Sequence, residues 1–283
     1  MGEYYYTSPT TVEECLTIMN QAEHKICIAA GCTNLMPCLQ SKKIPDCVLM
    51  DISGLKDLRG ICSDDKTIRI GALTTIHELQ HSDEIEQRAA ALWQACQRFA
   101  DPLVRNRATL GGNLANASPA ADSVVPLLVL DASVTVESIG AGKKEIPIES
   151  FFVAPGKSAL EPNELITAVS FPNDPDMKSC FIKSGLRQAM AISIINIGVA
   201  VKLEGSTIAD IRIALGAVAP VAIRAKQTEN YLIGKTISAE VLERAAELVK
   251  NEINPITDIR ASKEYRTHMA GILLRRAIEA VVA

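Results

Sequence analysis

The sequence lacks several features that mark common classes of protein. Its formal net charge is −4 and no Lys/Arg cluster is long enough to bind a polyanion, which excludes nucleic acid as a partner. The longest apolar runs, residues 124–130 and 189–201, fall short of the roughly 20 residues that span a bilayer, so no membrane association is predicted. Residues 1–10 have no basic start followed by an apolar stretch, and we therefore expect a cytoplasmic protein.

Closely spaced cysteines are lacking too. The eight cysteines contain no C-x-x-C pair, a pattern typical of reduced thiols in a cytosolic protein. The one candidate metal group has looser spacing than iron–sulfur or zinc ligands have, so we expect no metal on this chain. That group consists of Cys27, Cys32, Cys38 and Cys47.

No catalytic constellation stands out either. The sequence shows no nucleophile–base pair and no carboxylate pair, and its histidines are dispersed. We therefore predict surface or structural roles for the histidines and no catalytic residue on this chain. The histidines are His24, His77, His81 and His268.

The composition is that of an ordinary globular protein. Of the 283 residues 48% are hydrophobic and 22% are charged, which predicts two or three packed units. Hydrophobic periodicity divides the chain into an α/β unit (1–53), a second unit (54–175) and a C-terminal α+β unit (176–283). Predicted helices cover 11–20, 84–99, 124–130, 238–253 and 264–282, and predicted strands cover 25–30, 47–52, 67–71, 133–137, 165–171, 179–183, 192–203 and 208–216.

Two glycine-containing loops are the strongest local signals. Residues 29–35 (A-A-G-C-T-N-L) follow a predicted strand, where a tight turn can direct main-chain N–H groups at an anion. Residues 108–116 (A-T-L-G-G-N-L-A-N) combine two glycines with hydroxyl and amide side chains, a composition suited to a pyrophosphate. Neither loop matches the G-x-G-x-x-G or G-K-[ST] nucleotide motifs. By itself, each loop motif is more often an ordinary turn than a nucleotide-binding loop.

A longer motif resembles a known family. Residues 105–123 (R-N-R-A-T-L-G-G-N-L-A-N-A-S-P-A-A-D-S) resemble the R-N-x-A-T-x-G-G-N-x-x-x-A-S-P-x-A-D signature of the molybdopterin dehydrogenase FAD-binding family. The first loop is similar to that family's A-G-G-T-D-L. Residues 215–225 resemble its G-x-V-A-P-x-x-x-R-A segment, and residues 264–276 its E-Y-R-x-x-x-x-x-x-L-x-R-R. Because the matches keep their order, the resemblance covers essentially the whole chain.

The resemblance implies a fold and a function. It implies an α+β protein with the vanillyl-alcohol-oxidase-type (PCMH-like) FAD-binding fold, in which two α/β subdomains precede a C-terminal α+β domain with a three-stranded sheet and helices. It implies non-covalent FAD that takes electrons one at a time from a [2Fe–2S] cluster on a small partner subunit and delivers them to NAD+ or another acceptor. The molybdenum cofactor then lies on a large partner subunit, and a dimer of heterotrimers is one assembly that the resemblance allows.

The resemblance also assigns the cofactor-binding residues. The two loops are expected to hold the FAD diphosphate through main-chain amides, and residues of later strands to line the flavin. Phe99 falls where relatives place an aromatic ring, and it can equally be the apolar end of a helix. The assigned residues are Cys27, Ile28, Ala29, Ala30, Gly31, Cys32, Thr33, Asn34, Phe99, Thr109, Leu110, Gly111, Gly112, Asn113, Asn116, Ser118, Asp122, Leu165, Ile166, Ile182 and Lys183.

The chain departs from the family pattern at four positions. Cys32 replaces the usual second glycine of the first loop, and Asn34 replaces an acidic residue. In the segment 183–192, Gln188 and Ala191 stand where the family often has Arg and Asp, which puts the access of the electron acceptor in doubt. The cysteine-bearing insertion by which some relatives hold an additional iron–sulfur cluster is not found.

Two other classes of function stay open at this point. A stand-alone FAD oxidase or reductase of the same fold needs its own acid–base pair or a covalent flavin link, and none is evident. A scaffold protein that has lost the flavin is supported only by the substitutions at Cys32 and Asn34.

Overall fold

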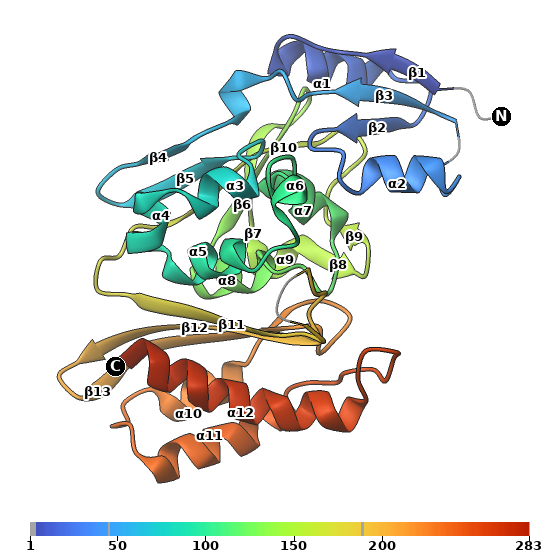
Figure 1. Cartoon of the computed structure of the whole chain (residues 1–283). Coiled ribbons are helices and arrows are strands. Elements are labelled where there is room, and N and C mark those ends of the chain that lie inside the picture. Colours follow the sequence, from blue (N-terminus) through green and yellow to red (C-terminus); the bar gives the residue numbers. More distant parts are fainter. Residues whose placement is uncertain (1–3, 45, 188–189, 283) are drawn as a thin grey trace.

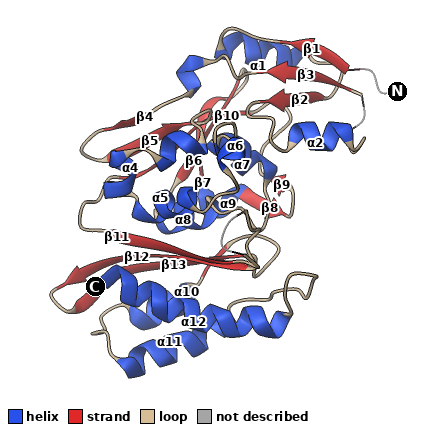
Figure 2. Cartoon of the chain, in the orientation of Figure 1, coloured by secondary structure: helices blue, strands red, loops and turns tan. Residues whose placement is uncertain are grey.

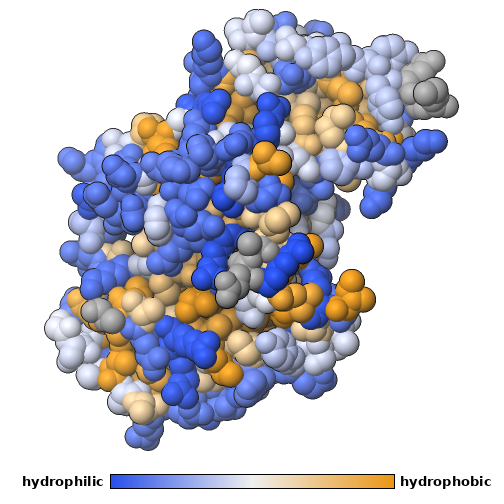
Figure 3. All heavy atoms as spheres, in the orientation of Figure 1, coloured by the Kyte–Doolittle hydropathy of each residue, from blue (hydrophilic) through white to orange (hydrophobic). Residues whose placement is uncertain are grey.

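The computed structural model describes residues 4–44, 46–187 and 190–282. Figure 1 shows three layers, one below the other: an N-terminal lobe, a middle part in which helices lie beside a sheet, and a C-terminal sheet with helices beneath it. In Figure 3 the N-terminal lobe projects beyond the middle of the molecule.

The N-terminal lobe is built on a three-stranded parallel sheet of order β1-β3-β2. Its strands are β1 (Tyr4–Thr7), β2 (Ile26–Ala29) and β3 (Cys47–Asp51), with helices α1 (Val12–Gln21) and α2 (Leu35–Gln40). Thr11 caps α1 by accepting a hydrogen bond from the Glu14 amide, and the helix buries Cys15, Leu16 and Met19 against the sheet. The sequence predicted β2, β3 and α1, but not the edge strand β1.

The middle part contains a five-stranded antiparallel sheet of order β4-β5-β10-β6-β7. The strand β10 (Leu165–Pro172) comes late in the sequence and pairs between β5 (Thr67–Gly71) and β6 (Ser133–Ser138). The remaining elements are β4 (Ile61–Ser63), β7 (Gly142–Pro147), β8 (Phe152–Ala154), β9 (Lys157–Ser158), η1 (Lys56–Leu58), α3 (Ile76–Gln80), α6 (Pro102–Arg105), α7 (Leu110–Asn116), α8 (Val124–Val129) and α9 (Ile148–Phe151).

The single helix predicted over residues 84–99 is wrong. Two helices, α4 (Asp83–Arg88) and α5 (Ala90–Gln97), are separated at Ala89, whose φ of −140° and ψ of 52° are not helical. The break frees the amide of Ala91, which donates to the Ser179 hydroxyl at 3.1 Å. A contact with a residue 88 positions away thus outweighs the local helical pattern.

The C-terminal part is an antiparallel sheet of order β11-β12-β13-β14. The three predicted strands are present as β11 (Lys178–Ser184), β12 (Ile195–Glu204) and β13 (Thr207–Gly216), and a two-residue strand β14 (Ile223–Arg224) joins them. The helices are α10 (Lys226–Leu232), α11 (Ala239–Asn251) and α12 (Lys263–Val282). Figure 2 shows the helices of this part below the sheet and those of the middle part above it.

The C-terminal sheet is buried on both faces. Large residues such as Ile197 and Val199 pack in one core with α11 and α12, whereas Ala200 and Ala214 belong to the core of the middle part. The second face is lined by small residues because α8 lies close: a Cβ on Gly198 would be 3.0 Å from Val125. The β12 sequence therefore alternates small and large apolar residues rather than polar and apolar ones.

The three larger sheets occupy separate stretches of sequence. The first ends at Asp51, the second runs from Ile61 to Pro172 and the third begins at Lys178. The two-stranded sheet of β8 and β9 lies within the second stretch. The division into domains 1–53, 54–175 and 176–283 stays a proposal. No helix in the described residues is long and apolar enough to cross a membrane.

Candidate cofactor site

A cavity of about 350 Å³ lies between the N-terminal lobe and the middle part. Three segments far apart in sequence form its walls: the loop between β2 and α2, the start of α7 and the start of β10. Its size is that of a small-molecule site. The predicted residues that line it are Ile28, Ala30, Gly31, Cys32, Thr33, Asn34, Phe99, Thr109, Gly111, Gly112, Asn113, Asn116, Leu165 and Ile166.

Gly31 brings the two glycine-containing segments into contact. A Cβ at this position would be 1.9 Å from the carbonyl oxygen of Arg107, so only glycine allows the two main chains to approach this closely. At the next position Cys32 has a φ of 61°, a left-handed conformation that costs a non-glycine residue about 1 kcal/mol. This backbone explains why the family uses glycine there, and Cys32 adopts the glycine-type turn.

The amides of the first loop have no acceptor in the described chain. The N–H groups of residues 31–34 border the cavity and make no hydrogen bond within the described residues. Buried or cavity-facing amides without partners are rare in proteins, and a row of them forms an anion-binding nest. The first loop therefore has the donors that a diphosphate needs.

The second segment is a helix start rather than a loop. Thr109 caps α7 by accepting a hydrogen bond from the Gly112 amide at 3.1 Å. The amides of Leu110 and Gly111 donate to Thr74 and Ala72, and that of Asn113 to Thr109. Because these four donors are used within the protein, this segment shapes the cavity through its glycines instead of presenting free amides.

Two side chains join the segments across the cavity. The Asn34 Nδ2 atom donates to Asn116 Oδ1 at 2.6 Å. Asn34 stands at the start of α2 but makes no capping bond there, so its amide is free for this contact. The departure from the family's acidic residue thus creates a neutral link between the two walls.

Electrostatics near the first loop are set by Asp51 and Arg107. Although burial acts in the opposite direction, hydrogen bonds from Ser53 and Tyr6 and the charge of Arg107 lower the pKa of Asp51. Burial, followed by the nearby Asp51 carboxylate, raises the pKa of the Cys32 thiol. Cys32 is therefore an uncharged thiol at neutral pH.

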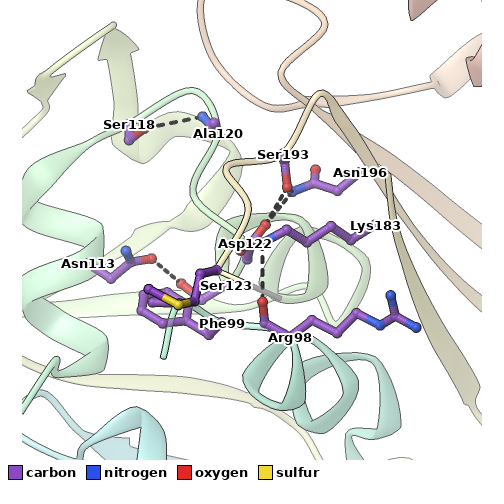
Figure 4. Close-up of polar contacts among 12 residues, drawn as sticks. Arg98, Phe99, Asn113, Ser118, Ala120, Asp122, Ser123, Lys183, Ser193 and Asn196 are labelled. Atoms are coloured by element: carbon purple, nitrogen blue, oxygen red, sulfur yellow. Dashed lines mark hydrogen bonds and ion pairs between the residues drawn. The ribbon is translucent and has the colours of Figure 1, made fainter. Parts of the chain in front are cut away.

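Asp122 and Lys183 lie outside the cavity, in a buried network (Figure 4). The Lys183 Nζ atom donates to Asp122 Oδ2 at 2.5 Å and to the Arg98 carbonyl at 3.2 Å. The other Asp122 oxygen accepts hydrogen bonds from Ser193 at 2.6 Å and Asn196 at 3.0 Å. This network connects the loop before α8 to the C-terminal sheet.

The other predicted residues also lie away from the cavity. Cys27 and Ala29 are buried in β2 on the side opposite Ile28, and Leu110 is buried inside α7. Ser118 accepts a hydrogen bond from the Ala120 amide, and Ile182 lines a different groove. Their cofactor contact stays a prediction.

Two of the departures from the family pattern lie in the segment after β11. Ala191 is half-buried beside Gly185, and Gln188 lies outside the described residues.

Sequence reasoning missed part of the cavity wall. Glu164 lines it with 7% of its surface exposed, held by Lys144 and by the Glu161 amide. Three of the missed residues, Leu35, Ala108 and Ala115, lie within the two glycine-containing segments, which could have identified them. The others come from several short segments with no common motif, so no local signal identifies them. The missed residues are Leu35, Cys38, Ile44, Ile52, Ala72, Leu73, Ala108, Ala115, Leu160 and Glu164.

The described residues contain no His/Cys/Asp/Glu group that could hold a metal ion.

Comparisons with known proteins agree on one family. Residues 2–174 match the FAD binding domain in molybdopterin dehydrogenase, and residues 181–281 match the CO dehydrogenase flavoprotein C-terminal domain. The chain is 34% identical over 238 residues to the xanthine dehydrogenase FAD-binding subunit of Escherichia coli O157:H7, covering 83% of this chain and 81% of that protein. It is 29% identical to the carbon monoxide dehydrogenase medium chain of Hydrogenophaga pseudoflava, covering 99% and 97%. A structure of carbon monoxide dehydrogenase from that organism superposes with a TM-score of 0.94 at 30% identity, covering 99% of this chain and 97% of that one.

Proposed function

Because the chain belongs to the FAD-binding subunits of the molybdopterin dehydrogenase family, we propose that it is the electron-transfer subunit between a small [2Fe–2S] partner and NAD+ or another acceptor. A large partner with the molybdenum cofactor oxidises the organic substrate, in the manner of a xanthine dehydrogenase. The complex acts in the cytoplasm and assembles as a dimer of heterotrimers.

The row of unpaired amides beside Gly31 is the observation that carries the cofactor assignment. These donors fit the diphosphate of FAD, and the close approach to Arg107 leaves no room for a side chain between the walls. When bound, the flavin supplies the redox chemistry, since it exchanges electrons singly or in pairs. The residues proposed to hold the diphosphate are Gly31, Cys32, Thr33 and Asn34.

Other residues have positioning roles in this proposal. Leu165 and Ile166 present apolar side chains at the start of β10 and exclude water from that wall of the cavity. Phe99 offers a half-buried ring at the end of α5 for packing against the cofactor. Thr109, Gly111 and Gly112 fix the second wall through the capped start of α7.

Two measurements test the proposal. The purified chain should show flavin absorption bands with one FAD per chain, which a scaffold without flavin would not. The complex purified from the native host should oxidise xanthine or a related heterocycle and reduce NAD+ or a dye, whereas the chain alone should oxidise none of them. Turnover of an organic substrate by the isolated chain would contradict the proposal and favour a stand-alone FAD oxidoreductase.

A further inference from the structure

A second groove of about 670 Å³ lies where the middle part meets the edge of the C-terminal sheet. Its walls are α4 and α5 on one side, and β11 with the end of α12 on the other. It shares no lining residue with the cofactor cavity. Of the residues predicted to contact the cofactor, Ile182 belongs to its described lining.

The groove is positively charged in a chain whose net charge is −4. Arg88, Arg98 and Lys178 line it, and among the described residues its lining contains no aspartate or glutamate. All three cationic residues are exposed, and none has an ion-pair or hydrogen-bond partner for its side chain in the described part of the chain. Cationic side chains without counter-charges around a hollow select an anionic ligand.

Apolar residues also line the groove. They include Met177, Phe181, Ile182 and Val281, together with Trp93, the one tryptophan of the sequence. Aromatic residues, methionine and arginine are the residue types that are enriched in protein–protein interfaces. A ligand here gains both burial and charge complementarity.

The groove and the cofactor cavity meet at one short segment of main chain, Arg98 and Phe99. Phe99 lines the cavity while its neighbour Arg98 lines the groove, and Lys183 holds this wall by donating to the Arg98 carbonyl. A redox partner that docks in the groove thus comes close to the cofactor cavity without entering it. This arrangement suits a donor of single electrons, which needs only to come close, because electrons tunnel through a thin layer of protein.

We propose that this groove, resting on the function proposed above, is the docking surface for an acidic segment of the iron–sulfur partner. The distribution of the cations favours a polypeptide segment over a single compact anion. Arg88 ends α4, Arg98 follows α5 and Lys178 begins β11, so the three charges stand on three separate elements around the groove. Several carboxylates along an extended segment match this distribution.

The test measures how fast the reduced [2Fe–2S] subunit reduces the flavin of this chain in stopped-flow mixing. The variant is Arg88→Glu with Lys178→Glu, and the matched control is Lys66→Glu with Arg244→Glu, two exposed cations elsewhere. The groove variant should lower the second-order rate constant at least about tenfold at low salt, and the difference should shrink at high salt. The control should stay within about twofold, because it carries the same net charge.

The outcomes separate the two proposals. If the partner does not reduce the flavin of the unaltered chain, the proposed function itself fails. If that reduction occurs and the groove variant behaves like the control, the docking proposal is overturned. A variant that keeps the partner's rate but raises the KM for NAD+ also overturns it and assigns the groove to the dinucleotide. Should the double Glu variant not fold, Arg88→Gln with Lys178→Gln should give a smaller decrease in the same direction.

Discussion

Gly31 is the residue whose replacement should affect the cofactor cavity most directly. Gly31→Ala places a methyl group where the Arg107 carbonyl lies at 1.9 Å, so the two walls have to separate. We expect FAD affinity to fall at least about tenfold, since one misplaced hydrogen-bond donor already costs on the order of 1 kcal/mol. Gly54→Ala is the matched control, because a Cβ there meets nothing within 4 Å. FAD titration of the apoproteins measures both, and equal affinities would remove the diphosphate from this loop.

The Asn34–Asn116 bond should slow the release of FAD. Asn34→Ala removes a contact of 2.6 Å between the walls, and a hydrogen bond of this kind contributes about 0.5–1.5 kcal/mol. We expect the FAD dissociation rate to rise by a factor between about 2 and 10. Asn116→Ala should have a similar effect, and the double variant should add nothing further if the two act as one link. Additive effects would show that each amide acts separately.

Cysteine reactivity gives a direct map of the cavity. Cys32 and Cys38 line it, whereas the exposed Cys62 lies on β4. Burial raises the pKa of Cys15 to about 11 and that of Cys96 to about 12, so both stay unreactive thiols at pH 8. The pKa of the Cys32 thiol is raised as well, so Cys38 carries the test. FAD should lower alkylation of Cys38 and leave Cys62 unchanged, as mass spectrometry can measure. Equal labelling of Cys38 with and without FAD would place the cofactor elsewhere.

Among the helices and strands, the sequence pattern predicted those that are stabilised by contacts within their own segment. Residues 12–21 carry a cap and a regular apolar face, and they form the predicted helix. The glycine-containing segment after Thr109 is helical instead of a loop because its amides bind Thr74 and Ala72 on the preceding loop. The strand β1 is recognisable only through its pairing with β3, 43 positions away. Non-local partners thus account for what the sequence pattern missed.

The turn before α12 makes stability depend on pH. Asp258 accepts hydrogen bonds from Arg260 and from Arg266, whose side chain is 1% exposed and also donates to the carbonyls of Ile194 and Ala217. The hydrogen bonds of Arg260, ahead of the charge of Arg266, hold the pKa of Asp258 well below its usual range. A carboxyl with a lowered folded-state pKa stabilises the fold above its unfolded pKa of about 4, and this contribution is lost as the pH falls further.

Asp258→Asn should therefore lower the free energy of unfolding at pH 7, and its difference from the unaltered chain should shrink as the pH falls below about 4. Urea unfolding at several pH values measures this difference. Asp65→Asn is the control, since Asp65 is exposed and has no partner in the described residues. A difference that grows towards low pH would contradict the assigned sign.

At the scale of the whole molecule, the family resemblance singled out Asp122 and Lys183 but did not predict the residues around them. Both were predicted as cofactor contacts through the family resemblance, and the fold places them in one buried ion pair between the middle part and the C-terminal sheet. Ser193 and Asn196, which complete the network, belong to no motif. Asp122 and Lys183 are 61 positions apart, so their ion pair forms only when the middle part packs against the C-terminal sheet. The pattern within one segment does not predict this packing.

Asp122→Ala should loosen the attachment of the C-terminal part. It leaves the Lys183 ammonium, 5% exposed, without its counter-charge, and breaking such a buried pair costs roughly 3 kcal/mol of unfolding free energy. The exposed pair of Asp174 with Lys202 is the control, where Asp174→Ala should cost less than about 1 kcal/mol. Adding Lys183→Met to Asp122→Ala should recover part of the loss, because it removes the unpaired charge.

Urea unfolding of the apoproteins measures these losses, and the fluorescence of Trp93, which lies beside β11, reports on this interface. Equal losses for Asp122→Ala and Asp174→Ala would mean that packing of α8 against the sheet, and not the ion pair, holds the two parts together.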